Sequence, residues 1–273
     1  MITFPNAKIN LGLNIVSRRP DGYHNIETVF YPIPLTDSLE IVPATGSETT
    51  MTCYGNKVDC PPDKNLVMKA YELMRTHYEV PAVDIYLYKR IPDGAGLGGG
   101  SSDAAHAMMM LNEMFALGAS DRELAARAVA LGADCPFFIY NRPVLAMGIG
   151  NVFTPVEVSL KGKTLLLVKP DVSVSTKEAY AQVTATPSPQ PIPEILSQPV
   201  GSWAGALKND FEKSVFAQFP ALATIKSEME QGGAQYCCMS GSGSSIFGIF
   251  DSDKLAKRLA SQWTGWRHFV MRL

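Results

Sequence analysis

The sequence predicts an α+β fold, because segments with the alternating pattern of strands are interspersed with segments of helical periodicity along the whole chain. The chain has 273 residues, of which 46% are hydrophobic and 18% charged. That composition allows a substantial core in one large domain or two modest ones. The net charge of −2 and the absence of a long run of like charge argue against a nucleic-acid partner.

The first part of the chain is rich in short strands. The alternation predicts strands over residues 8–16, 27–33 and 37–43. A helix is expected from Asn65, a plausible N-cap, to residue 78. The next segment, "VDIYLYKRI", returns to the strand period and should carry Ile85, Leu87 and Lys89 on one side.

A glycine-dense stretch, "IPDGAGLGGGSSDAA", follows that strand at residues 91–105, with five glycines between Gly94 and Gly100. It leads into a helix expected to end at Gly118. Such a turn leaves N–H groups unpaired, lets other atoms approach the backbone closely and ends on the positive end of a helix dipole. These properties are the requirements for holding a phosphate group.

Two common phosphate motifs do not explain the stretch. Gly94, Gly96 and Gly99 satisfy the G-x-G-x-x-G pattern, but the following helix leads to another helix with a capping box at residues 120–123, so the βαβ unit is missing. In the P-loop pattern, Gly100 occupies the place of the essential lysine. An ordinary flexible turn would not need five glycines followed by Ser-Ser-Asp at a helix start.

The second half of the chain continues the alternation of strands and helices, with a Pro-rich, exposed loop expected at residues 186–194. The short segment "GSGSS" at residues 241–245 joins two strands. The helix that begins with the capping box is expected to stop at Gly132, which puts Asp134 just past a helix end. The remaining predicted strands are 164–170, 235–240, 246–250 and 267–273, and the predicted helices are 176–183, 221–231 and 253–263.

The sequence carries no sign of export or of a membrane partner. The N-terminal residues lack a basic region followed by an apolar core, and the apolar runs are too short to span a bilayer. The five cysteines are odd in number and form no C-x-x-C pair, so we expect reduced thiols in a cytoplasmic protein.

Three segments together resemble the motifs of the GHMP kinase family, which includes galactokinase and the homoserine, mevalonate and phosphomevalonate kinases. They are "NAKINLGLNI" at 6–15, "PDGAGLGGGSSDAA" at 92–105 and "CMSGSGSSIFGIF" at 238–250. The resemblance implies an N-terminal ATP-binding domain with a mixed or antiparallel sheet over residues 1–155, and a C-terminal ferredoxin-like α/β domain over residues 156–273. It also implies ATP and Mg²⁺ as cofactors. The implied ATP-binding residues are Pro92, Asp93, Gly94, Ala95, Gly96, Leu97, Gly98, Gly99, Gly100, Ser101 and Ser102.

Four further segments are similar to one branch of that family: "PNAKINLGLNI", "RRPDGYHNIETVF", "GADCPFF" and "NDFE". The resemblance implies that ATP phosphorylates the 2-hydroxyl of a CDP-linked methylerythritol in the non-mevalonate isoprenoid pathway. Two alternatives stay open: a GHMP kinase for another small alcohol, such as homoserine or mevalonate, and a non-catalytic nucleotide-binding module on this fold.

The resemblance also implies roles for single residues. Lys8 and Asp134 match the catalytic pair, in which the aspartate takes the proton of the attacking hydroxyl and the lysine keeps it ionised and stabilises the transferring phosphoryl group. Tyr23 and Tyr180 would sandwich the cytosine, and His24 would bond its edge.

Other assignments are less specific. The resemblance implies that Asn10 lies close to the reacting end of the substrate, whereas Asn65 and Lys89 either border the adenine or act as a helix cap and a surface charge. Ser101, Ser102 and Asp103 are candidates to reach Mg²⁺, and the sequence does not choose among them. The oligomeric state, monomer or homodimer, is also open.

Overall fold

The computed structural model describes residues 1–58, 60–186 and 190–273, and its contacts divide the chain into two compact units. Unit 1 contains Met1–Ala7, Leu35–Asp93 and Gly98–Arg142. Unit 2 contains Lys8–Pro34, Gly94–Leu97 and Pro143–Leu273. The units are therefore built from separated stretches of chain, whereas the expected boundary at residue 155 divides the sequence once; that boundary stays a prediction.

Unit 1 contains, among its described residues, a mixed four-stranded sheet in the order β1-β4-β6-β5. Strand β5 runs parallel to β6, and the other neighbours are antiparallel. The side chains of β6 alternate as predicted, with Ile85, Leu87 and Lys89 all buried. The sequence analysis missed β1 and β5. The strands are β1 (Ile2–Thr3), β4 (Ser38–Pro43), β5 (Thr50–Gly55) and β6 (Val83–Lys89).

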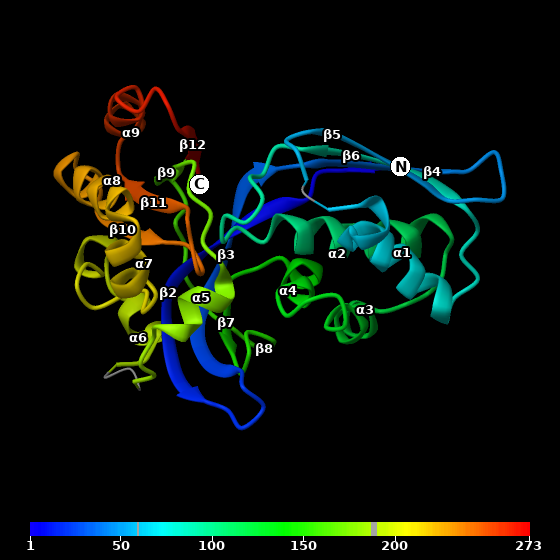
Figure 1. Ribbon diagram of the computed structural model, residues 1–273, viewed down its shortest axis with the longest axis horizontal. Coiled ribbons are helices and arrows are strands. Elements are labelled where there is room, and N and C mark those ends of the chain that lie inside the picture. Colours follow the sequence, from blue (N-terminus) through cyan, green and yellow to red (C-terminus); the bar gives the residue numbers. More distant parts are fainter. Residues whose placement is uncertain (59, 187–189) are drawn as a thin grey trace. The chain divides into compact units, whose positions relative to one another are not determined.

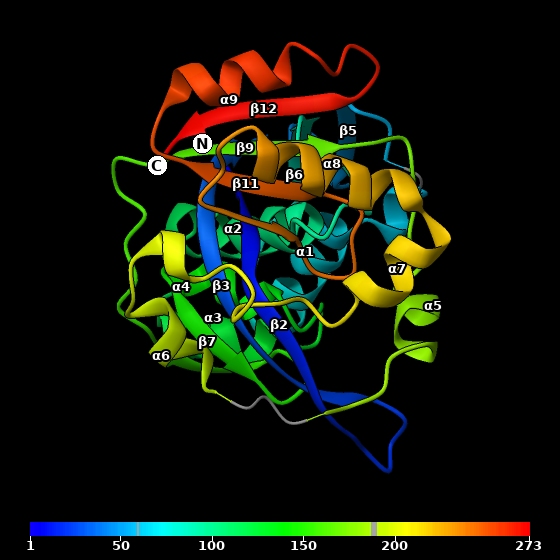
Figure 2. The same cartoon turned by 90° about the vertical axis from the view of Figure 1, so that its left-hand side faces the viewer.

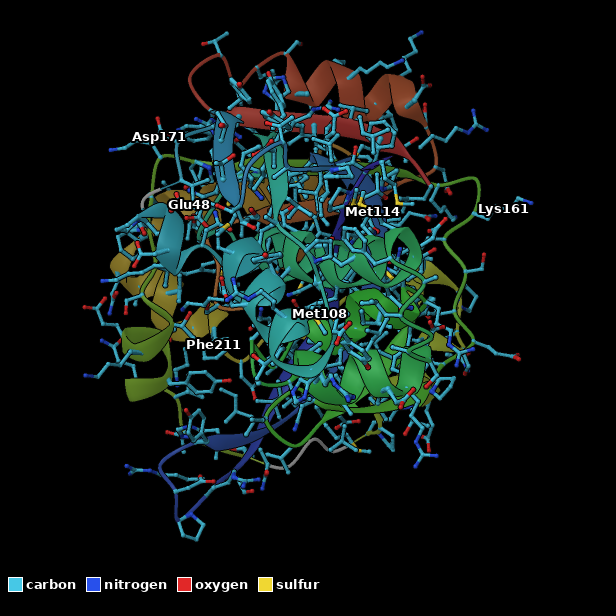
Figure 3. The ribbon with its side chains drawn as sticks, turned by 90° about the vertical axis from the view of Figure 1, so that its right-hand side faces the viewer. Glu48, Met108, Met114, Lys161, Asp171 and Phe211 are labelled. Carbon is cyan, nitrogen blue, oxygen red and sulfur yellow. The ribbon has the colours of Figure 1, made fainter. Side chains whose placement is uncertain are left out.

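Helices cover one side of this sheet, as Figure 1 shows for α1 and α2. Asn65 caps α1 as predicted, since its Oδ1 accepts a hydrogen bond from the Val67 N–H at 2.9 Å. The capping box of Ser120 and Glu123 is also present. Met108 of α2, labelled in Figure 3, is fully buried in the helical layer. The helices are η1 (Pro62–Lys64), α1 (Leu66–His77), α2 (Gly99–Met114), α3 (Asp121–Ala128) and α4 (Cys135–Tyr140).

Helix α4 corrects one expectation. Asp134 does follow the end of α3, but it is also the N-cap residue of α4, a helix that the sequence analysis did not anticipate. The signal was present, because Pro136 stands in the first turn, where its missing N–H costs nothing. Two consecutive buried phenylalanines, Phe137 and Phe138, anchor this short helix.

Unit 2 contains two four-stranded sheets within the described ranges. The first has the order β2-β3-β7-β8, and the predicted strands at 8–16 and 27–33 lie inside its two long strands. Strands β7 and β8 were missed, because each has only four residues. The strands are β2 (Asn6–Arg18), β3 (His24–Thr36), β7 (Val144–Met147) and β8 (Val152–Pro155), of which residues 6–7 and 35–36 belong to unit 1.

The second sheet of unit 2 is antiparallel, in the order β10-β11-β9-β12. Helix α8 (Pro220–Gln231) precedes β10, and α9 (Asp253–Ala260) connects β11 to β12, so the β-α-β-β-α-β order confirms the expected ferredoxin-like architecture (Figure 2). Apolar side chains of both helices, such as Ile225 and Leu259, share one core with the sheet. The strands are β9 (Thr164–Lys169), β10 (Tyr236–Met239), β11 (Ile246–Phe250) and β12 (Arg267–Arg272).

The segment between β9 and α8 is more helical than expected. The predicted Pro-rich loop over residues 186–194 is wrong at its end, because α6 begins at Ile192; residues 187–189 lie outside the described part of the chain. Pro193 occupies the first turn of α6, where proline favours a helix. The other elements here are α5 (Thr176–Ala181), α6 (Ile192–Leu196), η2 (Val200–Ser202) and α7 (Glu212–Gln218).

Two further expectations concern the whole chain. The five cysteines are free thiols in the structure. Among the described residues, no helix has the length and apolar character needed to cross a membrane.

Candidate active site

The glycine stretch forms a turn that only glycine adopts easily at three positions. Gly94, Gly96 and Gly98 have φ of 57°, 74° and 71°, in the left-handed region where a Cβ is strained. Helix α2 starts immediately after Gly98, and the Ser102 N–H closes its first turn on the Gly98 carbonyl at 2.9 Å. The N–H groups of residues 99–101 precede that bond and are the donors a helix start offers to an anion.

The carbonyl oxygens of the turn are held by other parts of unit 2. The Ala95 carbonyl accepts a bond from the Ser245 N–H at 3.3 Å, and the Leu97 carbonyl accepts one from the Lys8 N–H at 2.9 Å. The Gly96 carbonyl accepts bonds from the Lys8 ammonium at 2.9 Å and the Ser240 hydroxyl at 2.8 Å. Three consecutive carbonyl oxygens, each with a partial negative charge, are thus hydrogen-bonded within the protein. This arrangement suits a turn that is expected to bind an anion.

Gly96 also allows two backbones to touch. A Cβ at Gly96 would lie 2.0 Å from the Ser240 carbonyl oxygen, and one at Gly241 would lie 3.2 Å from the Gly96 Cα. The segment "GSGSS" therefore packs directly on the part of the turn that belongs to unit 2. Position 96 therefore requires glycine for this contact as well as for its positive φ.

Lys8 is a buried cation. Its side chain is 3% exposed, and its ammonium donates to the Asn10 Oδ1 at 2.7 Å and to the Gly96 carbonyl, while lying 4.9 Å from the centre of the Phe30 ring. Lys8 is therefore not a solvated charge at the end of a strand. Asn10 is also buried, and its Nδ2 donates to the Thr28 hydroxyl at 3.0 Å.

In unit 1, the turn that carries Asp134 packs against the first turn of α2. A Cβ at Gly132 would lie 3.4 Å from the Cys135 Sγ and 3.8 Å from the Ser101 Oγ, so both side chains flank this glycine. Asp134 is half-exposed. Burial raises the pKa of the Cys135 thiol to about 11, which keeps it protonated and supports its role in packing.

Lys89 lies in a buried cluster of three charged groups, not at the surface. Its ammonium contacts a carboxylate oxygen of Asp37 and lies 2.6 Å from the Asp103 Oδ2. Asp37 also accepts bonds from the N–H groups of Arg90 and Ile91 at 2.5 and 2.8 Å, and a Cβ at Gly99 would lie 3.3 Å from the Lys89 Nζ. The cluster thereby ties the start of α2 to the strand end before the turn.

The cluster carries two carboxylates for one ammonium. Asp103 is 2% exposed, and its Oδ1 has no hydrogen-bond partner within the described residues. Burial raises the pKa of Asp103 to about 7; Lys89 opposes the rise and Asp37 adds to it. Burial by itself lowers the pKa of Lys89, but the two carboxylates raise it above its usual value.

The aromatic residues predicted to hold a cytosine lie in unit 2, in a different pairing. His24 stacks on Tyr180, with ring centres 4.9 Å apart and planes at 17°, and Phe211 meets the Tyr180 ring edge-on at 4.8 Å. Tyr23 is 63% exposed. The sandwich by Tyr23 and Tyr180 and the substrate contact of Asn10 stay predictions.

Sequence reasoning missed several residues that shape the turn, above all Ser240, Thr28 and Asn209. The buried Asn209 Nδ2 donates to the carbonyls of Met239 and Gly241, both at 2.8 Å. The motif "NDFE" was noticed only as part of a resemblance. These residues could have been found as polar residues inside otherwise apolar strand and loop segments. Such residues are usually buried only where they form hydrogen bonds.

The metal candidates of α2 differ in accessibility. Ser102 is fully buried, Asp103 is paired with Lys89, and only Ser101 of the three is half-exposed. Within the described ranges, no group of three or more His, Cys, Asp and Glu side chains could hold a metal ion. A protein cage for Mg²⁺ therefore does not fit; a Mg²⁺ ion carried by nucleotide phosphates and water needs few protein ligands.

Alanine substitutions at Gly94 and Gly96 distinguish the effect of backbone strain on stability from the effect of close packing. Both have positive φ, but a Cβ at Gly94 meets no heavy atom of the described residues within 4 Å. Gly94→Ala should cost roughly 1–2 kcal/mol of unfolding free energy, from strain alone. Gly96→Ala should cost at least about 2 kcal/mol more, because backbone must move. Urea denaturation measures both, and equal losses would contradict the packing argument.

Asp103→Asn should change how stability depends on pH. The pKa of Asp103 in the fold, about 7, lies above that of an unfolded aspartate, near 3.9, so the folded chain binds more protons between these values. The unfolding free energy of the wild type should therefore fall as the pH rises from 5 to 8, by on the order of 1 kcal/mol or more relative to Asp103→Asn. Urea denaturation at both pH values tests this, with Asp121→Asn, an exposed carboxylate, as the control. Parallel pH profiles of wild type and Asp103→Asn would refute it.

Two family models match parts of the chain. The model of the GHMP kinases N-terminal domain matches residues 65–142, and that of the GHMP kinases C-terminal domain matches residues 192–266. The chain is 54% identical over 256 residues to a 4-diphosphocytidyl-2-C-methyl-D-erythritol kinase of Bacteroides fragilis, covering 93% of both chains. It is 55% identical over 251 residues to the kinase of the same name from Parabacteroides distasonis, covering 92% of both.

A solved structure agrees over nearly the whole chain. The crystal structure of a 4-(cytidine 5'-diphospho)-2C-methyl-D-erythritol kinase superimposes with a TM-score of 0.86 at 32% identity, covering 99% of this chain and 98% of that one. Sequence and structure are thus similar from end to end. The chain belongs to the GHMP kinase family.

Proposed function

We propose that this chain transfers the γ-phosphoryl group of ATP to the 2-hydroxyl of 4-diphosphocytidyl-2-C-methyl-D-erythritol, as a step of the non-mevalonate isoprenoid pathway. Relatives that match 93% of its length bear the name of that kinase. The structural observation that carries the proposal is the buried Lys8 ammonium bonded to the Gly96 carbonyl, because it sets a cation of fixed position at the glycine turn.

The reaction needs a proton acceptor and charge neutralisation more than covalent help. Asp134 takes the proton from the 2-hydroxyl, whose oxygen forms the new bond to the γ-phosphorus while the bond to the β–γ bridging oxygen breaks and ADP leaves. Lys8 stabilises the negative charge on the transferring group and favours the ionised form of Asp134. Two of the ammonium's N–H groups donate to the Asn10 Oδ1 and the Gly96 carbonyl, and these bonds hold the cation in one orientation.

ATP binds at residues 92–102. The backbone N–H groups at the start of α2 face the phosphates, and the helix dipole adds attraction of about 0.3–1 kcal/mol per exposed charge. A Mg²⁺ ion bound with ATP supplies further charge neutralisation, and the half-exposed Ser101 is the α2 side chain that suits it. Because Gly94 and Gly96 have no Cβ and adopt positive φ, phosphate oxygens can approach the backbone of the turn closely.

The cytosine is held by Tyr23 and Tyr180, with His24 bonding its edge. In the structure His24 covers the Tyr180 ring, so the base has to displace one ring to stack on the other. Stacking of a base on an aromatic side chain contributes roughly 1–3 kcal/mol, and it replaces a ring contact of smaller energy. Tyr23 is exposed and can complete the sandwich. We also propose a cytosolic location, consistent with five unpaired thiols.

An ADP-release assay with a panel of alcohols tests the substrate. With ATP and Mg²⁺, 4-diphosphocytidyl-2-C-methyl-D-erythritol should be turned over, whereas homoserine and mevalonate should not, and CMP should compete only with the former. Turnover of homoserine or mevalonate without inhibition by CMP would assign another alcohol. ATP binding by a folded chain without turnover of any alcohol would indicate a nucleotide-binding module.

Asp134→Asn tests the proton acceptor. The variant should lower kcat by about 100-fold or more while ATP still binds, since an amide cannot accept the proton. Steady-state kinetics and calorimetric titration with ATP measure the two effects. Asp121→Asn, which removes an exposed carboxylate from α3, should leave kcat unchanged. An unchanged kcat in Asp134→Asn would remove this residue from the role.

A further inference from the structure

Ser240 and Lys8 bind the same two oxygen acceptors. The Lys8 ammonium donates to the Asn10 Oδ1 at 2.7 Å and to the Gly96 carbonyl at 2.9 Å. The Ser240 hydroxyl lies 2.8 Å from that carbonyl and 3.4 Å from that amide oxygen, and it accepts a bond from the Asn10 backbone N–H at 3.3 Å. A serine 230 residues away from Asn10 in sequence thus shares both acceptors with the ammonium.

The hydroxyl is itself held in one place. Ser240 is fully buried, its N–H donates to the Ser245 carbonyl at 2.9 Å, and its own carbonyl touches Gly96. On both sides of it, the carbonyls of Met239 and Gly241 accept bonds from the Asn209 amide. The backbone around Ser240 therefore has little freedom, and the direction of its Cβ–Oγ bond follows from it.

These contacts determine where the ammonium points. An ammonium has three N–H groups in tetrahedral directions, so two bonds to fixed acceptors settle the direction of the third. If either acceptor shifts, the cation turns with it. Asn10 is also tied to Thr28. The carbonyls on both sides of Gly96 are bonded to backbone N–H groups, whereas the Gly96 carbonyl accepts from the Lys8 ammonium and the Ser240 hydroxyl. The Ser240 hydroxyl restrains this second acceptor.

We propose that Ser240 is a positioning residue for phosphoryl transfer: by holding the Gly96 carbonyl and Asn10, its hydroxyl orients the Lys8 ammonium toward the transferring group. The proposal rests on the proposed kinase function. It assigns no contact between Ser240 and either substrate. Its effect should therefore appear in the chemical step and should require Lys8.

The test is a double-mutant cycle of Ser240→Ala and Lys8→Met, read in kcat and in the KM values for ATP and the alcohol. Ser240→Ala should lower kcat about tenfold and leave both KM values within about threefold, because a misplaced cation weakens the transition state more than the ground state. In the Lys8→Met background, measured under single-turnover conditions with labelled ATP, the same substitution should change the rate less than twofold.

Ser214→Ala is the matched control. It removes another hydroxyl of unit 2 that donates to a backbone carbonyl, that of Phe211 at 3.1 Å, but in α7 and without contact to the turn. Its kcat should equal that of the wild type even if its thermal stability falls. If Ser240→Ala does not fold, Ser240→Cys keeps the shape of the side chain with a weaker donor and should give a smaller loss of the same kind.

The outcomes distinguish a failure of the positioning role of Ser240 from a failure of the proposed kinase function. Absence of turnover by the wild type removes both. With an active wild type, the positioning role is overturned by an unchanged kcat in Ser240→Ala, by a loss confined to KM, or by an equal loss of rate with and without Lys8. The last result would show that Ser240 acts on the turn independently of the cation.

Discussion

The hydrogen bond from the Lys8 ammonium to the Gly96 carbonyl is the contact on which the rest of the candidate site in unit 2 depends. A buried ammonium is costly unless its N–H groups are satisfied. Here the acceptors are neutral, a carbonyl and an amide oxygen, and the Phe30 ring adds its negative face. The two oxygens and the ring stabilise the buried cation inside unit 2.

This arrangement places a strict demand on Gly96. Its carbonyl can reach both Lys8 and Ser240 only if the backbones of the turn and of the "GSGSS" segment touch, and a Cβ would keep them apart. The glycine content of the turn therefore serves more than phosphate binding. Gly96 permits a contact inside the protein, whereas a Cβ at Gly94 would meet no heavy atom of the described residues within 4 Å, so the φ of Gly94 is the reason for its glycine.

The buried lysine of unit 1, Lys89, is instead stabilised by charged partners. Lys89 has two carboxylate partners, so the cluster with Asp37 and Asp103 carries excess negative charge when both are ionised. The pKa of Asp103 is raised mainly by burial, and the second carboxylate, Asp37, adds to the rise. The cluster fixes the end of β6 and the start of α2, the two elements that flank the glycine turn. Lys89 is thus paired with carboxylates, whereas Lys8, the cation we propose for catalysis, donates to neutral oxygens.

Local pattern was sufficient for the elements whose side chains alternate or repeat clearly. The caps at Asn65 and Ser120, the alternation of β6 and the strand and helix order of the ferredoxin-like part follow from residues close together in sequence, and all are present. Short elements with weak periodicity, such as β7, β8 and α4, escaped detection because four to six residues cannot establish a period.

The sequence by itself determined that a glycine-dense turn precedes a helix, from which we predicted a phosphate site, and motif resemblance pointed to Lys8. Only the tertiary structure decided that Lys8 is buried and shares its acceptors with Ser240, and that Lys89 belongs to an ion cluster instead of the surface. The reason is physical: periodicity and capping act over a few residues, whereas the partners of Lys8 and Asn10 lie 88 and 230 positions away. Such contacts arise from packing, which no local pattern encodes.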